Sequence, residues 1–403
     1  MTAPEDELTP LAELFDPQHR ADPYPRYRAW READPVHRAG GMLVLTRHED
    51  CTSVLRNPAF GHAEADEAPV RGDPPLVDED GRPVRSFLGL NPPDHTRLRR
   101  LVSAAFTPRR VALLAPRVEE LARQRVDEVH GGGPVDLIGA LAAPLPVMVI
   151  SELLGVPAQD HERFAGWSRA MARGLDPDFL LAPEVLAQQE RARAEFVDYF
   201  RELIAERRQR PADDLLSDLV AVRDRGDSLT EQELLATCVL LLIAGHETTV
   251  NLIGNGTLGL LREPAQLRRL RADPELAEPA VEEVLRHDSP VQLTLRHALR
   301  DTEVAGNPVA AGTFALVVLG AANRDPLAYR DPERFDIGRD PSRHLAFGQG
   351  IHFCLGASLA RLEGRAVFAE LARRPASLQL AGEPTWKENV VLRGMSRLPV
   401  EPA

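Results

Sequence analysis

The feature that most limits the possible folds is a helical pattern of apolar residues that runs from Glu231 to Leu261. Four further segments place apolar residues three to four positions apart: Val111–Val129, Glu184–Arg208, Leu276–Arg286 and Gly356–Leu371. Strand signals are fewer, and they lie at Met42–Leu45, at Val304–Val318 with turns near Gly306 and Gly312, and at Val390–Val400, where we expect a closing hairpin. The chain is therefore predicted to be mostly α with smaller β-sheets, an α+β fold.

The length and the charge balance limit the class of protein. A chain of 403 residues can bury a large core as one big domain or two smaller ones. No repeat or low-complexity linker divides it, so we predict one domain over residues 1–403, with a long functional loop in the acidic, Pro- and Gly-rich stretch His62–Pro83. The 48 Lys and Arg against 61 Asp and Glu give a net charge of −13, which argues against nucleic-acid binding. Lys387 is the only lysine.

The N-terminus and the cysteines indicate a cytoplasmic protein. The acidic, Pro-broken N-terminus lacks the basic start and apolar run of a signal peptide, and the longest apolar stretches are too short to span a membrane. Cys51, Cys238 and Cys354 show no paired spacing, so neither a disulfide framework nor a Cys-cluster zinc site is supported. We expect a protein in a reducing cytoplasm with no membrane anchor.

The segment with the clearest chemistry is Phe347-Gly-Gln-Gly-Ile-His-Phe-Cys-Leu-Gly356, in which Cys354 lies between glycines just before a helical pattern. Such a loop lets Gly350 take a positive φ and point backbone N–H groups at the sulfur, while the helix N-terminus stabilises negative charge. Phe347 would shield the sulfur from water, and Gly356 would let a flat cofactor come close. The segment predicts a thiolate ligand; the alternative is a buried, inert cysteine in a Gly-rich loop.

This segment resembles the haem-binding loop of the cytochrome P-450 family, the haem-thiolate monooxygenases. Other segments are similar to the family's motifs, in the family's order: Asp22–Pro25, Asp94–Arg99, Ala244–Thr249, Glu283–Arg286 and Asp331–Phe335. The resemblance implies a cytochrome P-450-like single domain with haem between a long distal helix and a proximal Cys-loop helix. It also implies a flexible substrate-access loop at residues 62–90 and a helix-connecting lid region at residues 174–195.

The resemblance further implies that the cofactor is haem b with Cys354 as its axial ligand. His95, Arg99, Arg296 and His352 would hold the haem propionates, although a plain surface pair is the alternative for His95 and Arg99, which lie four residues apart. The other implied cofactor contacts are Phe347, Gly350, Gly356, Ala244 and Gly245.

The segment Ala244–Thr249 resembles the family's oxygen-activating motif. Dioxygen bound to iron must receive protons without flooding the pocket, and a Thr hydroxyl in a locally opened helix, backed by a carboxylate, can organise that delivery. Thr248 and Glu247 would take these catalytic roles. A mid-helix Thr that bonds back to an earlier carbonyl is the alternative.

The pair Glu283 and Arg286 resembles the family's E-x-x-R motif. The same spacing recurs elsewhere in this Arg-rich chain, where most such pairs are solvated helix faces. Its position between the distal motif and the Cys loop favours a structural role. The resemblance implies a buried ion-pair network with Arg334.

The resemblance assigns the substrate pocket only by region. Several apolar residues in these regions would make the wall mainly apolar, which favours a bulky hydrophobic substrate. Each of them could equally be ordinary core: Phe87, Leu88, Phe179, Leu180, Val291, Leu293 and Val391.

We therefore predict a monooxygenase that inserts one oxygen atom of dioxygen into a bulky hydrophobic small molecule, such as a macrolide or polyketide, a steroid- or terpenoid-like compound, or a cyclic peptide. A ferredoxin with its reductase would supply electrons, docking near the Arg-rich segment 97–110, and the enzyme would be a monomer. Three alternatives remain: oxidative coupling or epoxidation instead of hydroxylation, a non-catalytic haem protein that binds a substrate or carrier protein, and a helical binding protein without haem.

Overall fold

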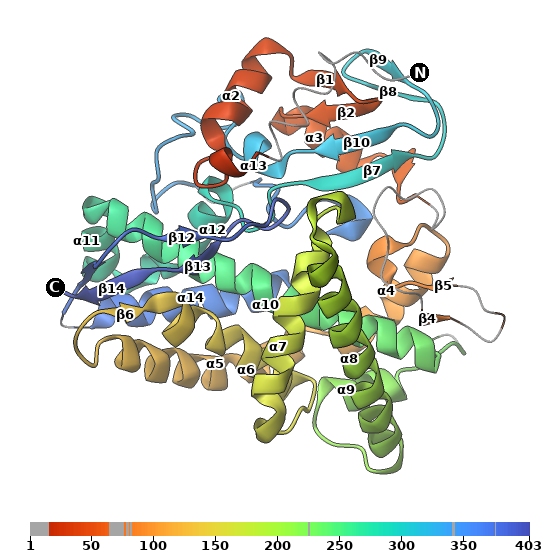
Figure 1. The fold of residues 1–403 in the computed structure, drawn as a ribbon, viewed down its shortest axis with the longest axis horizontal. Coiled ribbons are helices and arrows are strands. Elements are labelled where there is room, and N and C mark those ends of the chain that lie inside the picture. Colours follow the sequence, from red (N-terminus) through yellow and green to blue (C-terminus); the bar gives the residue numbers. More distant parts are fainter. Residues whose placement is uncertain are drawn as a thin grey trace. The chain divides into compact units, whose positions relative to one another are not determined.

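The computed structural model describes residues 16–63, 76–77, 80, 83–224, 226–340, 343–374 and 376–403. The chain forms two compact units, of which unit 1 holds residues 1–62, 119–142 and 248–403, and unit 2 holds residues 63–118 and 143–247. Two helices contribute residues to both units, α5 (Pro108–Val129) and α10 (Glu231–Arg262) (Figure 1). The single domain stays a prediction.

Unit 1 contains a five-stranded sheet with the strand order β1-β2-β10-β7-β3. Its strands are β1 (Val36–Ala39), β2 (Met42–Leu45), β3 (Phe60–Gly61), β7 (Thr294–Ala298) and β10 (Phe314–Val317). Strand β10 runs parallel to β2, with Leu316 opposite Val44, and antiparallel to β7, with Ala315 opposite Arg296. The sheet thus joins the N-terminal hairpin to strands from the C-terminal half of the chain (Figure 1).

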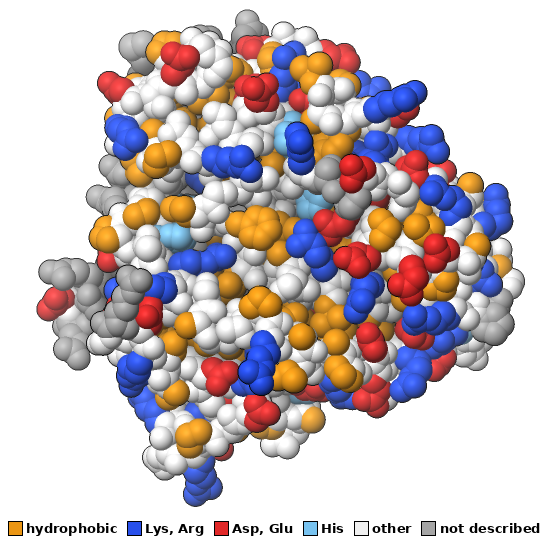
Figure 2. Space-filling view, turned by 180° about the vertical axis from the view of Figure 1, so that it is seen from behind, with side chains coloured by type: hydrophobic (Ala, Val, Ile, Leu, Met, Phe, Trp, Pro, Cys, Tyr) orange, Lys and Arg blue, Asp and Glu red, His pale blue; other side chains and the backbone are white. Residues whose placement is uncertain are grey.

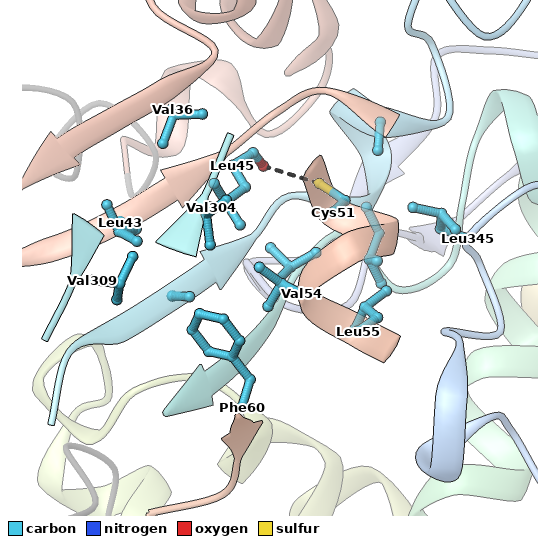
Figure 3. Close-up of a cluster of buried hydrophobic side chains, with 14 of the residues drawn as sticks. Val36, Leu43, Leu45, Cys51, Val54, Leu55, Phe60, Val304, Val309 and Leu345 are labelled. Atoms are coloured by element: carbon cyan, nitrogen blue, oxygen red, sulfur yellow. Dashed lines mark hydrogen bonds between the residues drawn. The ribbon is translucent and has the colours of Figure 1, made fainter. Parts of the chain in front are cut away.

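Apolar side chains of this sheet pack with helix α3 (His48–Arg56) into a buried cluster (Figure 3). Leu43 and Leu45 are two residues apart on β2, so they point to the same face of the sheet, where Cys51 and Val54 of α3 meet them. The Sγ of Cys51 donates a hydrogen bond to the carbonyl oxygen of Leu45 at 3.4 Å. Cys51 is therefore a core residue.

The rest of unit 1 consists of helices and three small sheets. Its other helices are α2 (Tyr24–Ala33), α11 (Pro264–Ala272), α12 (Ala277–His287), α13 (Leu319–Ala322) and α14 (Ala357–Arg373), with the turns η1 (Pro17–His19), η3 (Ile138–Ala142), η7 (Pro274–Leu276) and η8 (Gly350–His352). The small sheets pair β8 (Thr302–Val304) with β9 (Asn307–Val309), β12 (Thr385–Trp386) with β13 (Met395–Arg397), and β14 (Pro399–Pro402) with both β11 (Leu378–Leu380) and β6 (Val135–Asp136).

Unit 2 is mainly helical. Its elements are β4 (Leu76–Val77), β5 (Pro83–Val84), η2 (Phe87–Gly89), α4 (Asp94–Ala105), α6 (Pro144–Leu153), η4 (Ala158–Asp160), α7 (His161–Ala172), η5 (Arg173–Leu175), η6 (Asp178–Leu180), α8 (Pro183–Gln209) and α9 (Leu215–Ala221). Buried aromatic rings join α7 to α8, with the centroids of Phe164 and Phe196 5.9 Å apart. The described part of the expected access loop forms β4, β5 and η2, and the remainder lies outside the described residues; the expected lid region holds η6 and the start of α8.

Helix α10 is α-helical over its full length from Glu231 to Arg262, so the expected local opening near Thr248 is not present. The helix is long and apolar enough to span a membrane, but 83% of its most apolar window is buried inside the fold. It is a core helix. The side chains near Thr248 are more accessible than those around them. Ala244 is exposed, and Gly245 and Thr248 are half-buried, whereas His246, Glu247 and Thr249 are buried.

The expected hairpin at Val390–Val400 is wrong. The structure places β13 against β12 and β14 between β11 and β6, so the two strands belong to different sheets. Val391 and Leu392 instead meet the segment after α12, where Gln292 N donates to Val391 O at 2.9 Å and Val291 bridges to Leu392. The apolar pattern marked strands but could not specify their partners.

Candidate active site

The Cys354 loop of unit 1 is a tight, internally bonded turn. Cys354 N donates to Phe347 O at 2.9 Å, and Phe353 N donates to Gly350 O at 3.1 Å. Gly350 has a φ of +72°, and a Cβ there would collide with the carbonyl oxygen of Leu55. Helix α14 begins at Ala357 directly after the loop. The backbone at position 350 therefore requires glycine. Cys354 lies just before the N-terminus of α14, where negative charge is favoured.

The three cysteines have different environments. Cys51 and Cys238 are fully buried, and burial raises the pKa of each thiol far above its usual range. Cys354 is half-buried. It is therefore the cysteine best able to present a thiolate.

An arginine that the sequence did not single out lies beside this loop. Arg361 of α14 holds its guanidinium carbon 4.6 Å from the centre of the Phe347 ring and donates to Glu282 Oε1 at 2.7 Å. The hydrogen bond to Glu282 raises the pKa of Arg361, and the charges of Glu282 and Cys354 raise it further. Arg361 follows Cys354 by seven residues and lies in the second turn of α14, and its place in the helix directly after the Cys loop is the signal that could have identified it.

Arg296 is a buried cation whose charge is not balanced. Only 7% of it is exposed, and its Nη1 donates to Thr294 Oγ1 at 3.1 Å and to Leu295 O at 2.8 Å. Among the described residues no carboxylate pairs with it, and burial lowers its pKa to about 10. In the same unit, the His352 ring lies 4.6 Å from the His62 ring, edge to face. The buried, uncompensated charge of Arg296 favours a bound anion.

In unit 2, helix α4 brings His95 and Arg99 together with Phe87. The rings of His95 and Phe87 are 6.4 Å apart, and the Arg99 guanidinium carbon lies 5.2 Å from the Phe87 ring centre. His95 is buried, and burial followed by the charge of Arg99 lowers its pKa, which disfavours the charged imidazolium. The i, i+4 spacing thus places the two residues beside one aromatic ring.

The oxygen-motif residues lie on consecutive turns of α10. Glu247 is buried, with 7% of it exposed, and Thr248 is half-buried. The neighbouring His246 is fully buried and its Nδ1 shares a 2.6 Å hydrogen bond with Ser168 Oγ. A Cβ on Gly245 would meet Ile150 Cδ1 at 3.5 Å, which is ordinary contact. A carboxylate and a hydroxyl are therefore adjacent on a helix whose surroundings are mostly apolar.

The ion-pair network of Glu283 differs from the expectation in its third member. Glu283 Oε2 accepts from Arg286 Nε at 2.7 Å, with both side chains almost fully buried. Arg334 does not join them: its side chain is 63% exposed and lies near Asp336, and only its carbonyl oxygen accepts from Arg286. Arg339 instead approaches Glu283 at 3.3 Å. Nothing in the spacing identifies Arg339, because the loop that carries it has no regular pattern.

Comparisons with known proteins show the family of this chain. A sequence model of the family described as Cytochrome P-450 matches residues 175–374. The vitamin D(3) 25-hydroxylase of Pseudonocardia autotrophica is 42% identical over 399 residues, which cover 96% of each chain. The polyketide biosynthesis cytochrome P-450 PksS of Bacillus subtilis is 39% identical and covers 94% of this chain and 95% of its own. This chain belongs to the cytochrome P-450 family.

The crystal structure of the P-450 CYP164A2 from Mycobacterium smegmatis superposes on this chain with a TM-score of 0.88 at 44% identity, covering 98% of this chain and 99% of that one. The protein is therefore a P-450 monooxygenase with the mostly helical fold of that family, and its cofactor is haem bound through a cysteine thiolate. Its residues fit this cofactor. Arg296 is buried without a counter-charge, and the position beside Gly356 has no heavy atom within 4 Å of a Cβ.

The predicted substrate residues of this P-450 fall in both units. In unit 1, Val291 and Val391 lie on two hydrogen-bonded segments, and Leu293 next to them is buried. In unit 2, Phe87 is buried, Leu88 is 44% exposed and Leu180 is half-buried. The Phe179 side chain lies outside the described part of the structure.

The Arg-rich segment 97–110 is not the cationic surface that we expected. Arg97 pairs with Glu233 and Asp227, Arg100 pairs with Asp224, and Arg110 pairs with Asp213 and Asp218, all within unit 2. These carboxylates neutralise much of the positive charge. The sequence showed the cations together, but the acids that neutralise them come from α9 and the residues just before it, from residues 224 and 227, and from the start of α10.

Proposed function

We propose that Cys354 is the haem ligand and that the enzyme uses Thr248 and Glu247 to oxidise a bulky apolar molecule. The observation that carries the assignment is the contrast among the cysteines. Cys354 is half-buried in a glycine loop at the start of α14, whereas Cys51 and Cys238 are sealed in the core with raised thiol pKa values. When bound, a thiolate-ligated haem supplies oxygen activation, because the thiolate favours cleavage of the O–O bond.

The chain's own residues hold the cofactor and move protons. Arg296 and His352 in unit 1, and His95 and Arg99 in unit 2, would bind the propionates; the buried, unbalanced charge of Arg296 supports this role. The Thr248 hydroxyl would hold a hydrogen bond at the oxygen site and pass on a proton, with the buried Glu247 carboxylate as its source. Most of the apolar part of α10 is buried, which limits the access of bulk water to this helix.

The substrate class follows from the pocket segments and the named relatives. Val291, Leu293 and Val391 lie together and offer an apolar wall. Relatives that cover nearly the whole chain are named for vitamin D(3) and for polyketide biosynthesis. Large, mostly apolar secondary metabolites of the polyketide or steroid type are therefore the proposed substrates.

A ferredoxin is the proposed electron donor to a monomeric cytoplasmic enzyme. Ile351 and Phe353 on either side of His352 are 55% and 41% exposed, and nearby Arg56 is exposed and donates to the neutral amide of Gln349. Two apolar side chains and a cation suit a small acidic iron–sulfur protein that must approach Cys354. This face replaces segment 97–110 as the proposed docking surface.

The test is the absorption spectrum of the reduced protein under carbon monoxide. The wild type should show the red-shifted Soret band of a thiolate-ligated haem, and Cys354→Ala should abolish it. Cys51→Ala and Cys238→Ala are the matched controls and should keep it. A band that survives in Cys354→Ala but disappears with either core cysteine would refute the ligand assignment.

A further inference from the structure

Two buried asparagines lie on α10 shortly after Thr248. Asn251 and Asn255 are 1% and 2% exposed. Lys387 Nζ donates to Asn251 Oδ1 at 2.9 Å. Asn255 Nδ2 donates to Asp288 O at 3.3 Å and to Arg393 O at 3.1 Å. Each amide therefore has one end fixed by the segments that pack on α10.

The other ends of these amides have no hydrogen-bond partner among the described residues. Within the described part of the chain, Asn251 Nδ2 and Asn255 Oδ1 are both buried and make no hydrogen bond. One is a donor and the other an acceptor, and a separation of four residues puts them on the same helix face. Buried polar groups of this kind are costly unless water satisfies them, and one water can serve both.

The backbone at Gly394 shapes the space around this pair. A Cβ on Gly394 would collide with the Asn251 side chain, so glycine lets the chain come close to the amide. Lys387 N also donates to Gly394 O at 3.0 Å, which ties the lysine's backbone to the same segment. The lysine ammonium and Gly394 therefore hold Asn251 in one orientation, with Oδ1 towards Lys387 and Nδ2 away from it.

We propose that an ordered water bridges Asn251 Nδ2 and Asn255 Oδ1, that this water belongs to the proton route to Thr248, and that Lys387 is a positioning residue that orients the Asn251 amide to hold it. The proposal rests on the proposed role of Thr248. Thr248 and Asn251 are neighbours on the helix surface, and one water spans the distance typical of such i, i+3 side chains. The water accepts a proton from solvent as it passes another towards the Thr248 hydroxyl, so no charge accumulates.

The composition of the chain makes Lys387 unusual. It is the only lysine among 48 Lys and Arg residues. An ammonium is a compact donor that can contact a single amide oxygen, whereas the planar fork of Arg is suited to two acceptors. A lysine at this one half-buried position therefore matches the need to fix one amide in a restricted space.

The test uses two variants: one removes the Asn251 N–H donor, and the other removes the ammonium group of Lys387. Asn251→Asp keeps an oxygen for Lys387 but replaces the N–H donor with an acceptor, and Lys387→Met removes the orienting cation. Both should keep haem and the carbon monoxide band. Product formed per electron should fall about fivefold, with hydrogen peroxide in its place, since one well-placed hydrogen bond carries about that factor. Arg330→Met, which removes a cation that is 95% exposed, should match the wild type.

A second measurement does not depend on turnover or on substrate. With ¹⁵N-labelled lysine the protein gives a single side-chain ammonium signal, because Lys387 is the only lysine. A hydrogen bond to Asn251 protects this signal from solvent exchange, and Asn251→Ala should shift it and speed its exchange. An unchanged signal would refute the orienting contact even if a variant lost activity through misfolding.

The outcomes distinguish this inference from the proposed function. If Thr248→Ala uncouples the enzyme while Asn251→Asp and Lys387→Met remain coupled, the water route is wrong and the proposed function stands. If Thr248→Ala itself stays fully coupled, the proton role of Thr248 fails. Uncoupling in all three variants with a normal carbon monoxide band supports the proposal.

Discussion

Arg296 shows how a single residue reveals the need for a ligand. Its guanidinium is desolvated, its pKa is lowered to about 10, and its described partners are a hydroxyl and a carbonyl oxygen. A buried cation without a counter-charge destabilises the fold that holds it. The burial of this residue is therefore consistent with a bound anion, and we propose that a haem propionate is that anion.

Replacing Arg296 with Met should stabilise the apoprotein and weaken haem binding. The lowered pKa corresponds to a cost of about 3 kcal/mol, from which the loss of two hydrogen bonds subtracts, so a net gain of roughly 1–2 kcal/mol is expected. Urea unfolding of apoprotein and a haem-transfer assay measure the two effects. A less stable Arg296→Met apoprotein would show that the arginine is a structural residue.

At the residue scale, the sequence predicted the position of Cys354 and the positive φ of Gly350, because loop geometry restricts which residues can stand there. It did not predict the burial of Arg296 without a carboxylate, since that depends on the path of distant acidic residues. It also missed Lys387 and Asn251 as partners, which are 136 positions apart.

At the scale of elements, the Glu283 network links α12 to the loop that follows α13. The Glu283 carboxylate accepts from Arg286 within the helix, and its Oε1 accepts from Asp336 N at 2.8 Å and from Arg339 Nε at 3.3 Å. Helical periodicity fixes the first pair, because residues three apart are neighbours. The third member comes from an irregular loop, where no periodicity identifies Arg339 over Arg334.

Arg339→Gln should therefore be more damaging than Arg334→Gln. Removing Arg339 leaves Glu283 buried with one fewer donor and should cost about 1–2 kcal/mol, whereas the exposed Arg334 should cost less than about 0.5 kcal/mol. Chemical unfolding and haem content measure both variants side by side. Equal losses, or a larger loss for Arg334→Gln, would restore Arg334 as the network residue.

We expect the histidine at the C-terminus of α12 to make the stability of the enzyme sensitive to acid. His287 Nε2 donates to Glu333 O at 3.0 Å, and its Nδ1 lies 3.2 Å from Arg324 Nη2. Burial, then Arg324 and Arg286, lowers the pKa of His287 to about 3, whereas the unfolded chain has the ordinary value of 6.5. The unfolded state therefore binds the proton first, so stability present above pH 6.5 is lost as the pH falls towards 3.

His287→Gln, which can keep a donor and an acceptor, should reduce this acid sensitivity. Between about pH 7 and 5 the wild type should lose about 2 kcal/mol more unfolding free energy than the variant. Urea unfolding at the two pH values measures the difference. The same loss in both proteins would assign the acid sensitivity to other groups.

At the scale of the whole molecule, the chain carries a net charge of −13. On the face seen in Figure 2, acidic and basic side chains are interspersed. The sequence identified the fold class because five long helical patterns agree with the observed helices to within about three residues at each end. It could not give the sheet order β1-β2-β10-β7-β3, because strand pairing joins segments more than 250 residues apart.

The last prediction concerns the coupling of electrons to product, which depends on the complete catalytic cycle. Thr248→Ala should keep haem, the carbon monoxide band and the spectral shift on substrate binding, because none of these requires a proton relay. Electron consumption should continue while the product rate falls about ten- to a hundredfold, the range for a positioned proton donor, with hydrogen peroxide formed instead.

The measurement is product per reduced nicotinamide consumed in a reconstituted ferredoxin system, with peroxide assayed in parallel. Thr249→Ala, at the next position of α10, is the matched control. Because Thr249 is 3% exposed, its loss should affect packing and stability instead of coupling. If Thr249→Ala uncouples the enzyme and Thr248→Ala does not, the hydroxyl that delivers the proton is that of Thr249, and the assignment to Thr248 is wrong.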